Sequence, residues 1–310
     1  MNNVVKILTA TKGLNTKVDP VRLKYSKSSG IQELAVAVNV DIDDTGRISR
    51  RKGFTQQVAG NYHSLFCHTD TVLCVTGDAF CLLNADYSAT PLRNVTRDAR
   101  MSYCPVDDKI YYANSYETGY VFNNLSYAWV QGDYVGPDTD KVFSDPPIGS
   151  VVAYYNSRVY VAQGKVLWYS EPFNYNSFNL HQNFIQFEAQ ILMVRPVSTG
   201  IFVGTETITY FISGANPAEG YNRLPVCNYA PLKHTDISLN GRLVLNPESD
   251  PEIQFSNEGE SVLWISKQGV CYGGPQGSFH NLTQEKLDLP ESATGSSLLI
   301  DEKFIGLINP

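Results

Sequence analysis

The residues that could bind a metal are the histidines and cysteines, and their spacing indicates no shared site. The histidines are His63, His68, His181, His234 and His280, and the cysteines are Cys67, Cys74, Cys81, Cys104, Cys227 and Cys271. No H-x-H, H-E-x-x-H or C-x-x-C motif brings such ligands together. Cys74 and Cys81 fall in apolar runs, where free cysteine behaves as a small hydrophobic residue. The sequence therefore predicts buried thiols, and neither a metal nor a cofactor.

Residues for catalysis are no better organised. Neither a G-x-S-x-G nucleophile turn nor a lysine-containing phosphate loop occurs. The carboxylate pairs that a glycosidase needs would have to come from Asp107/Asp108, Asp138/Asp140 or Glu258/Glu260. All three pairs lie in Gly-, Asn- or Pro-rich turns, where acidic side chains are usually solvated. We therefore expect no enzymatic activity and no catalytic residues, with a glycan hydrolase as an alternative.

Aromatic side chains offer a second kind of binding chemistry. Exposed aromatic rings bind sugars, and the candidates are Trp129, Trp168, Trp264 and the pairs Tyr111-Tyr112 and Tyr154-Tyr155. Large rings also fill the space between packed sheets, and we expect that role for the tryptophans. Within each tyrosine pair, alternation along a strand predicts one ring inside and one outside.

Charge is distributed unevenly around a net value of −7. Residues 1–60 hold ten basic and five acidic side chains, and the rest of the chain is acidic. Phosphate contacts dominate nucleic-acid affinity, so sequence-specific DNA binding is not expected. The strongest basic cluster is Arg47, Arg50, Arg51 and Lys52, with Lys17, Arg22, Lys24 and Lys27 preceding it. It is either a solvated turn or a docking interface for an acidic partner surface, and we predict the interface.

The elements that must position these residues are short strands. Units of three strands, such as HSLFCH, TVLCVTG and AFCLLN, recur about every 40–50 residues and are separated by turn residues. This pattern predicts an all-β protein, a β-propeller of about six or seven blades over residues 31–310. We expect an extended arm over residues 1–30. The last strand, KFIGLI, is predicted to pair with VNVDID or RISRRKG and so close the ring. The alternative fold is a β-sandwich with a second small β-domain.

Targeting signals are not evident in the sequence. Residues 1–10 lack a basic leader followed by a long apolar run, and no window approaches ~18 consecutive apolar residues. We expect no membrane-spanning segment and synthesis in a reducing cytoplasm.

The opening segment resembles a known family. KGLNTKVDPVRLKYSKSSGIQELAVAVNVDIDDTGRISRRKGF is similar to the N-terminal segment of tail structural proteins of short-tailed bacteriophages, with their N-V-D-I-D-x-x-G-R-[IL]-x-x-R-x-G signature. The matching residues are Asn39, Val40, Asp41, Ile42, Asp43, Gly46, Arg47, Arg50, Arg51 and Gly53. Blocks within residues 146–179 and 261–283 resemble phage virion proteins too.

The resemblance is to the tail hub, nozzle or DNA-stabilising tail accessory family. It implies a virion tail protein, made in the bacterial host cytoplasm, that forms a homohexameric ring below the portal and adaptor. Such a ring extends the DNA channel, retains packaged DNA until ejection, and lets double-stranded DNA pass without reading its sequence. The chain is shorter than related nozzles, which puts a gating role in doubt. A receptor-binding or decorating propeller on the tail is the alternative.

Overall fold

The computed structural model describes residues 11–23, 25–26, 30–43, 45–137, 140–214, 217, 220–240, 259–292, 294–300 and 303–309. These residues form strands, with two 3₁₀ turns named η1 (Pro20–Arg22) and η4 (Pro275–Gly277). Outside the blades lie the paired strands β1 (Tyr25–Ser26) and β2 (Gly30–Ile31), β3 (Val40–Ile42) and β4 (Ile48–Arg50), and β25 (Thr294–Ile300) and β26 (Lys303–Asn309).

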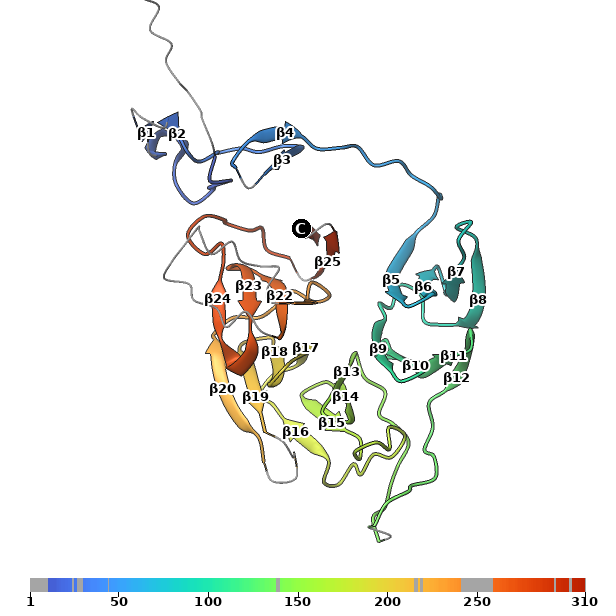
Figure 1. The fold of residues 1–310 in the computed structure, drawn as a ribbon. Coiled ribbons are helices and arrows are strands. Elements are labelled where there is room, and N and C mark those ends of the chain that lie inside the picture. Colours follow the sequence, from blue (N-terminus) through green and yellow to red (C-terminus); the bar gives the residue numbers. More distant parts are fainter. Residues whose placement is uncertain are drawn as a thin grey trace, which may run out of the picture.

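Five antiparallel sheets of four strands make up the rest of the fold, arranged around a common centre (Figure 1). The first contains β5 (Tyr62–His68), β6 (Thr71–Thr76), β7 (Ala79–Leu83) and β8 (Ala89–Asn94). The second contains β9 (Ser102–Val106), β10 (Lys109–Ala113), β11 (Thr118–Phe122) and β12 (Leu125–Ala128). The third contains β13 (Val151–Tyr155), β14 (Arg158–Gln163), β15 (Val166–Tyr169) and β16 (Phe184–Gln186). The fourth contains β17 (Ile191–Val197), β18 (Gly200–Thr205), β19 (Thr209–Ser213) and β20 (Asn222–Cys227). The fifth contains β21 (Ile237–Asn240), β22 (Glu260–Ser266), β23 (Gly269–Gly273) and β24 (Phe279–Asn281).

Each sheet is a blade of a β-propeller, and the five blades together are called the ring below. Strand order within a blade follows chain order, and the first strand of one blade lies beside the first strand of the next, as β9 does with β13 and β13 with β17. The predicted all-β propeller is therefore confirmed. With the two-stranded sheets β3–β4 and β25–β26, the five complete blades agree with the predicted six or seven.

Tight turns separate the strands where the sequence carries turn residues. Gly77 has a φ of +63°, Asp107 of +53°, and Asn156 and Ser157 of +46° and +64°. These left-handed values suit two-residue hairpin turns, whose twist matches that of the flanking strands. The turn residues thus fix the pairing of β6 with β7, β9 with β10 and β13 with β14.

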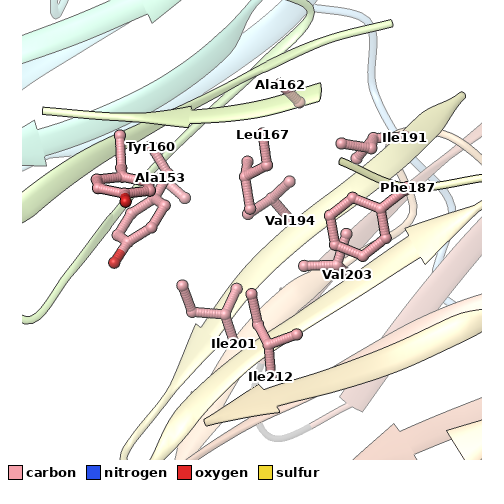
Figure 2. Packing of buried hydrophobic residues seen from close by; sticks show 11 residues of the cluster. Ala153, Tyr160, Ala162, Leu167, Phe187, Ile191, Val194, Ile201, Val203 and Ile212 are labelled. Carbon is pink, nitrogen blue, oxygen red and sulfur yellow. The ribbon is translucent and has the colours of Figure 1, made fainter. Parts of the chain in front are cut away.

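The core lies between neighbouring blades. Figure 2 shows Ala153, Tyr160 and Leu167 of the third blade facing Val194, Ile201 and Ile212 of the fourth. Similar clusters join the second blade to the third, the first to the second and the fourth to the fifth. Because each inner blade is covered on both faces, its middle strands are buried on both sides, as β18 is over its whole length.

Ring closure differs from the prediction. The last strand, β26, pairs along its whole length with β25, and β3 pairs with β4. Within the described residues, neither β25 nor β26 pairs with the first strands, so the predicted pairing of KFIGLI with VNVDID or RISRRKG is wrong. The local partner, TGSSLLI, needs a much shorter loop to close, and its Leu299 packs with Phe304 of β26 against the fifth blade.

Candidate interaction surface

The basic residues singled out in the sequence belong to a small N-terminal module, defined as the described residues between 11 and 50. Backbone hydrogen bonds join its segments: Thr11 N–H donates to the Gly46 carbonyl at 2.9 Å, and Asn15 N–H to the Leu34 carbonyl at 2.8 Å. Residues 11–16, 32–34 and 43–47 are thereby joined into one unit. The predicted boundary at residue 30 falls inside this module, and the first blade begins at Tyr62.

The turn between β3 and β4 is shaped by Asp43. Its Oδ1 accepts hydrogen bonds from Thr45 N–H at 3.0 Å, the Thr45 hydroxyl at 2.6 Å and Arg47 N–H at 2.9 Å. The hydroxyl of Thr45 and the backbone N–H of Arg47 lower the pKa of the Asp43 carboxyl. Gly46 has a φ of +77°, which only glycine adopts without strain. The D-x-x-G-R part of the signature therefore encodes a turn of fixed shape.

The two ends of this hairpin are tied as well. Arg51 N–H donates to the Asn39 carbonyl at 3.0 Å, and Arg51 Nε donates to Asp41 Oδ1 at 3.2 Å. Asn39 has a φ of +56°, a conformation that asparagine tolerates better than most residues. These signature residues thus have a structural role in the hairpin.

Two arginines of the signature have side chains that take no part in holding the hairpin together. Arg47 and Arg50 are exposed, at the turn and at the last position of β4. Within the described part of the chain, no hydrogen bond or ion pair engages either guanidinium. The next residue, Lys52, is also exposed. The structure therefore brings Arg47, Arg50, Arg51 and Lys52 together on one hairpin and its exit, which we call the basic hairpin.

The other predicted interface residues lie apart from this hairpin. The Lys17 ammonium donates to the Gln284 carbonyl, and Arg22 is the exposed last residue of η1. Lys24 and Lys27 lie outside the described residues. Lys17 therefore takes part in a contact within the chain rather than extending the basic hairpin.

The N-terminal module is attached to the ring at two places. Thr16 N–H donates to the Lys286 carbonyl at 2.8 Å, and Asp288 N–H to the Thr16 hydroxyl at 2.9 Å. The second attachment is covalent: residues 52–60, called the linker below, are all exposed and make no backbone–backbone hydrogen bond. In Figure 1 this segment runs from β4 to β5.

The aromatic residues considered for sugar binding lie mostly in the core. Trp129 is 3% exposed and Trp264 0%, and Trp168 packs at the edge of the cluster between the second and third blades. Tyr111 and Tyr112 are 2% and 0% exposed. The two rings alternate as expected, with Tyr111 packed towards the third blade and Tyr112 towards the first. The expectation that one of them points outward is wrong, because both faces of the second blade are covered by neighbours.

The cysteines and carboxylates form no reactive group in the described residues. All six thiols are free; Cys74, Cys81, Cys104 and Cys271 are buried, whereas Cys67 is exposed. Burial raises the pKa of Cys74 to about 11 and that of Cys104 to about 12. No cluster of three metal-ligating side chains is found in this part of the chain. Asp107 and Asp108 lie at a hairpin turn, and Asp138 and Glu258 are outside the described residues.

One buried carboxylate escaped the sequence reasoning. Glu171 is 4% exposed, and its Oε1 lies 3.2 Å from Lys141 Nζ and accepts from Asn183 Nδ2 at 2.9 Å. Its Oε2 lies 4.0 Å from Arg158 Nη1. Two cations and an amide thus surround this carboxylate, and these contacts fix the loop between β15 and β16.

Comparisons with known proteins agree on the fold alone. No family model matches the chain, and no curated protein matches it. Among solved structures, the extracellular domain of a putative one-component system from B. thetaiotaomicron is similar with a TM-score of 0.50 and 11% identity, over 82% of this chain and 33% of that one. The N-terminal domain of Nup159 is similar at 0.46 and 10% identity, over 79% of this chain and 71% of that one. The Pan2 WD40 domain of Neurospora crassa is similar at 0.39 and 10% identity, over 75% and 70%.

No helix among the described residues has the length and apolar character needed to cross a membrane.

Proposed function

We propose that this chain is a structural protein of a bacteriophage tail, a hub- or nozzle-type ring component and not an enzyme. In this role copies of the chain assemble, as a homohexamer, below the portal and adaptor. The ring extends the DNA channel and retains packaged DNA until ejection. The chain would be made in the bacterial host cytoplasm and would then be located in the virion tail.

The observation that carries this proposal is that the signature residues of the hairpin fall into two groups, one structural and one exposed. Asp43, Gly46 and Arg51 of the phage-type signature hold the hairpin in shape, whereas Arg47 and Arg50 stay exposed without a partner in the described residues. Folding therefore accounts for part of the signature and leaves two cations for an external contact. Much of the chain is acidic beyond residue 60, so a neighbouring copy offers a surface of opposite charge.

The propeller ring supports the same role. Its large aromatic residues fill the spaces between blades, its buried Glu171 is compensated by cations, and Asp107 and Asp108 lie at a hairpin turn. A rigid body with a separate basic hairpin is suited to making contacts in an assembly.

The proposal is tested first by quantitative mass spectrometry of purified phage particles, with this chain measured against the portal protein. A closed cyclic ring predicts ~6 copies per particle. Absence from the particle would contradict the structural role. Recovery only in preparations of host cell lysate would contradict it equally.

A second experiment tests the basic hairpin itself. The variant Arg47→Glu/Arg50→Glu reverses two exposed charges and should abolish ring assembly, measured by mass photometry or by electron microscopy of the purified chain with its tail partners. The matched control is Arg97→Glu/Lys267→Glu, which makes the same charge change at two exposed positions of the ring. Equal assembly by both variants would contradict a docking role for the hairpin.

A further inference from the structure

A pocket lies at one end of the propeller axis, where the inner strands of several blades begin. It has a volume of about 190 Å³. Its lining comes from the segments that enter β9, β13, β17 and β21, represented by Arg100, Ser150, Ile191 and Lys233, and from the turn after β10. We call it the axial pocket. Residues far apart in the sequence meet there because the propeller brings equivalent strand ends to one centre.

Positive charge gathers at this pocket. Arg100 and Lys233 both line it, as does His234. Lys233 has no ion pair or side-chain hydrogen bond within the described residues. Arg100 donates through Nη1 to the Gly295 carbonyl at 2.7 Å and to Ser296 Oγ at 2.8 Å, so its partners there are neutral. Neither cation is compensated by a bonded carboxylate.

Three acidic groups lie nearby, and each is hydrogen-bonded or exposed. The Glu117 carboxylate accepts from Thr96 N–H at 3.0 Å and from Asn114 Nδ2. Asp236 Oδ2 accepts from Arg195 Nε at 2.8 Å, so its charge is matched by an arginine on β17. Asp98 is exposed and lies two residues before Arg100. The remaining positive charge at the pocket contrasts with the acidic composition of the chain beyond residue 60.

Two imidazoles near the pocket have lowered pKa values, mainly because they are buried. Burial lowers the pKa of His234 to about 4; Asp236 opposes this, and the positive charges of Arg100 and Lys233 and the nearby His63 reinforce it. Burial and Arg100 lower the pKa of His63, against Asp98. His63 Nδ1 contacts Ser64 Oγ at 2.9 Å, whereas its buried Nε2 has no hydrogen-bond partner among the described residues.

We infer that the axial pocket binds one oxyanion group, a phosphate or a carboxylate, through Arg100 and Lys233. Both cations favour such a group, since charge-assisted hydrogen bonds to oxyanions are the stronger kind. The volume restricts the ligand, because pockets for drug-sized molecules begin at roughly 300 Å³. The site therefore takes a single charged group, either a free ion or the end of a side chain.

The experiment uses the full chain and inorganic phosphate as probe, titrated at constant ionic strength with chloride as the balancing anion. Saturable binding is expected by calorimetry or NMR. The Lys233→Gln variant should weaken it by about tenfold or more, as loss of a charged hydrogen bond does. Lys267→Gln, which removes one exposed charge from a hairpin turn of the fifth blade, is the matched control and should change the affinity less than about twofold.

A second measurement distinguishes phosphate binding in the axial pocket from nonspecific electrostatic screening by phosphate. Saturation with phosphate should raise the pKa of His234, followed by the imidazole resonances, because the bound negative charge offsets Arg100 and Lys233. Binding that is not saturable, or that Lys233→Gln leaves unchanged, would overturn the assignment. An unchanged His234 pKa at saturation would place the ion elsewhere and overturn it too.

The source of the oxyanion is distinguished by a parallel titration with acetate. Tighter binding of phosphate supports a phosphoryl ligand, and tighter binding of acetate supports a carboxylate; both results support an oxyanion site. Failure of both ions to bind would overturn this inference while leaving the proposed tail role intact, since that role depends on assembly through the basic hairpin.

Discussion

The ring and the N-terminal module are stabilised by different interactions. The blades bury large side chains such as Trp264, Tyr112 and Phe202 at 0% exposure. In the module, the buried described side chains are the polar Thr11 and Asn15, and apolar Val21 and Val38 are 92% and 76% exposed. Hydrogen bonds hold the module in shape, and each contributes only about 0.5–1.5 kcal/mol net. The ring therefore has its own apolar core, whereas the module lacks one and lies against the segment around Lys286.

The largest expected effect comes from removing a core side chain of the ring. Trp264→Ala should lower the free energy of unfolding by about 3–5 kcal/mol, because a fully buried tryptophan leaves a cavity between the fourth and fifth blades. Phe54→Ala removes a linker side chain that is 86% exposed, and it should change the free energy of unfolding by less than about 0.5 kcal/mol. Denaturant unfolding followed by circular dichroism measures both. Similar losses would show that the linker packs in solution.

Acid should destabilise the ring before it affects the hairpin. The folded pKa of His234 is about 4, below its ordinary value of 6.5, mainly because of burial. Between those values the unfolded chain takes up a proton that the folded chain does not. Stability from this group is thus complete above pH 6.5 and is lost as the pH falls towards 4, by about 3 kcal/mol at most.

The Asp43 carboxyl in the hairpin also loses its stabilising contribution on acidification, but in a lower pH range. Its folded pKa is lowered from 3.8, chiefly by the Thr45 hydroxyl, so its contribution is present above pH 3.8 and is lost only below that value. Unfolding measured by denaturant at a series of pH values checks the order. His234→Asn should flatten the dependence between pH 6.5 and 4. An unchanged slope in that variant would assign the acid sensitivity to another group.

Adding a methyl group should next distinguish the ring from the linker that joins it to the module. A Cβ at Gly119 on β11 would lie 2.7 Å from the Tyr127 carbonyl and would also clash with the Tyr112 hydroxyl. Gly119→Ala should therefore cost roughly 1–3 kcal/mol through overpacking. Gly53→Ala, at a position with no atom within 4 Å, should be neutral or slightly stabilising. Thermal unfolding of the two variants decides, and a destabilised Gly53→Ala would reveal an unrecognised contact.

The smallest contrast concerns ion pairs. Arg195–Asp236 in the ring has side chains 33% and 10% exposed, whereas Arg51–Asp41 in the hairpin has 50% and 35%. Asp236→Ala should cost about 1–3 kcal/mol because it leaves a partly buried arginine without its partner. Asp41→Ala should cost about 0–1 kcal/mol. The two variants are compared by denaturant unfolding, and equal costs would mean that exposure does not set the strength of these pairs.

The same contrast explains which strands the sequence predicts. The second strands of a blade, such as β6 and β10, carry apolar runs bounded by turn residues, and the three-strand units were predicted close to their observed bounds. The fourth strands were missed because they are largely exposed: β12 and β20 lack the apolar pattern that marks a buried strand. Strand β25, with its serines, was missed for a related reason, and this produced the wrong partner for β26.

The interaction sites were predictable to different degrees. The basic hairpin is local in sequence, so Arg47, Arg50 and Arg51 could be recognised together. The axial pocket is not, because Arg100 and Lys233 meet only when blades far apart in the chain share a centre. Lys17 looked like part of the basic surface, but its contact with the Gln284 carbonyl depends on tertiary structure that a sequence pattern does not report.

The linker between the module and the ring has a consequence for assembly. Nine extended residues span at most about 30 Å, so the module stays at an effective concentration in the millimolar range relative to its own contact surface near Lys286. A separate copy in dilute solution cannot compete with that value. A neighbouring copy held within the reach of the linker can compete. Exchange of the module between such neighbours would then change the free energy little, because the same contacts are made in either arrangement. The linker length thus sets how close two copies must be before their modules can exchange between them.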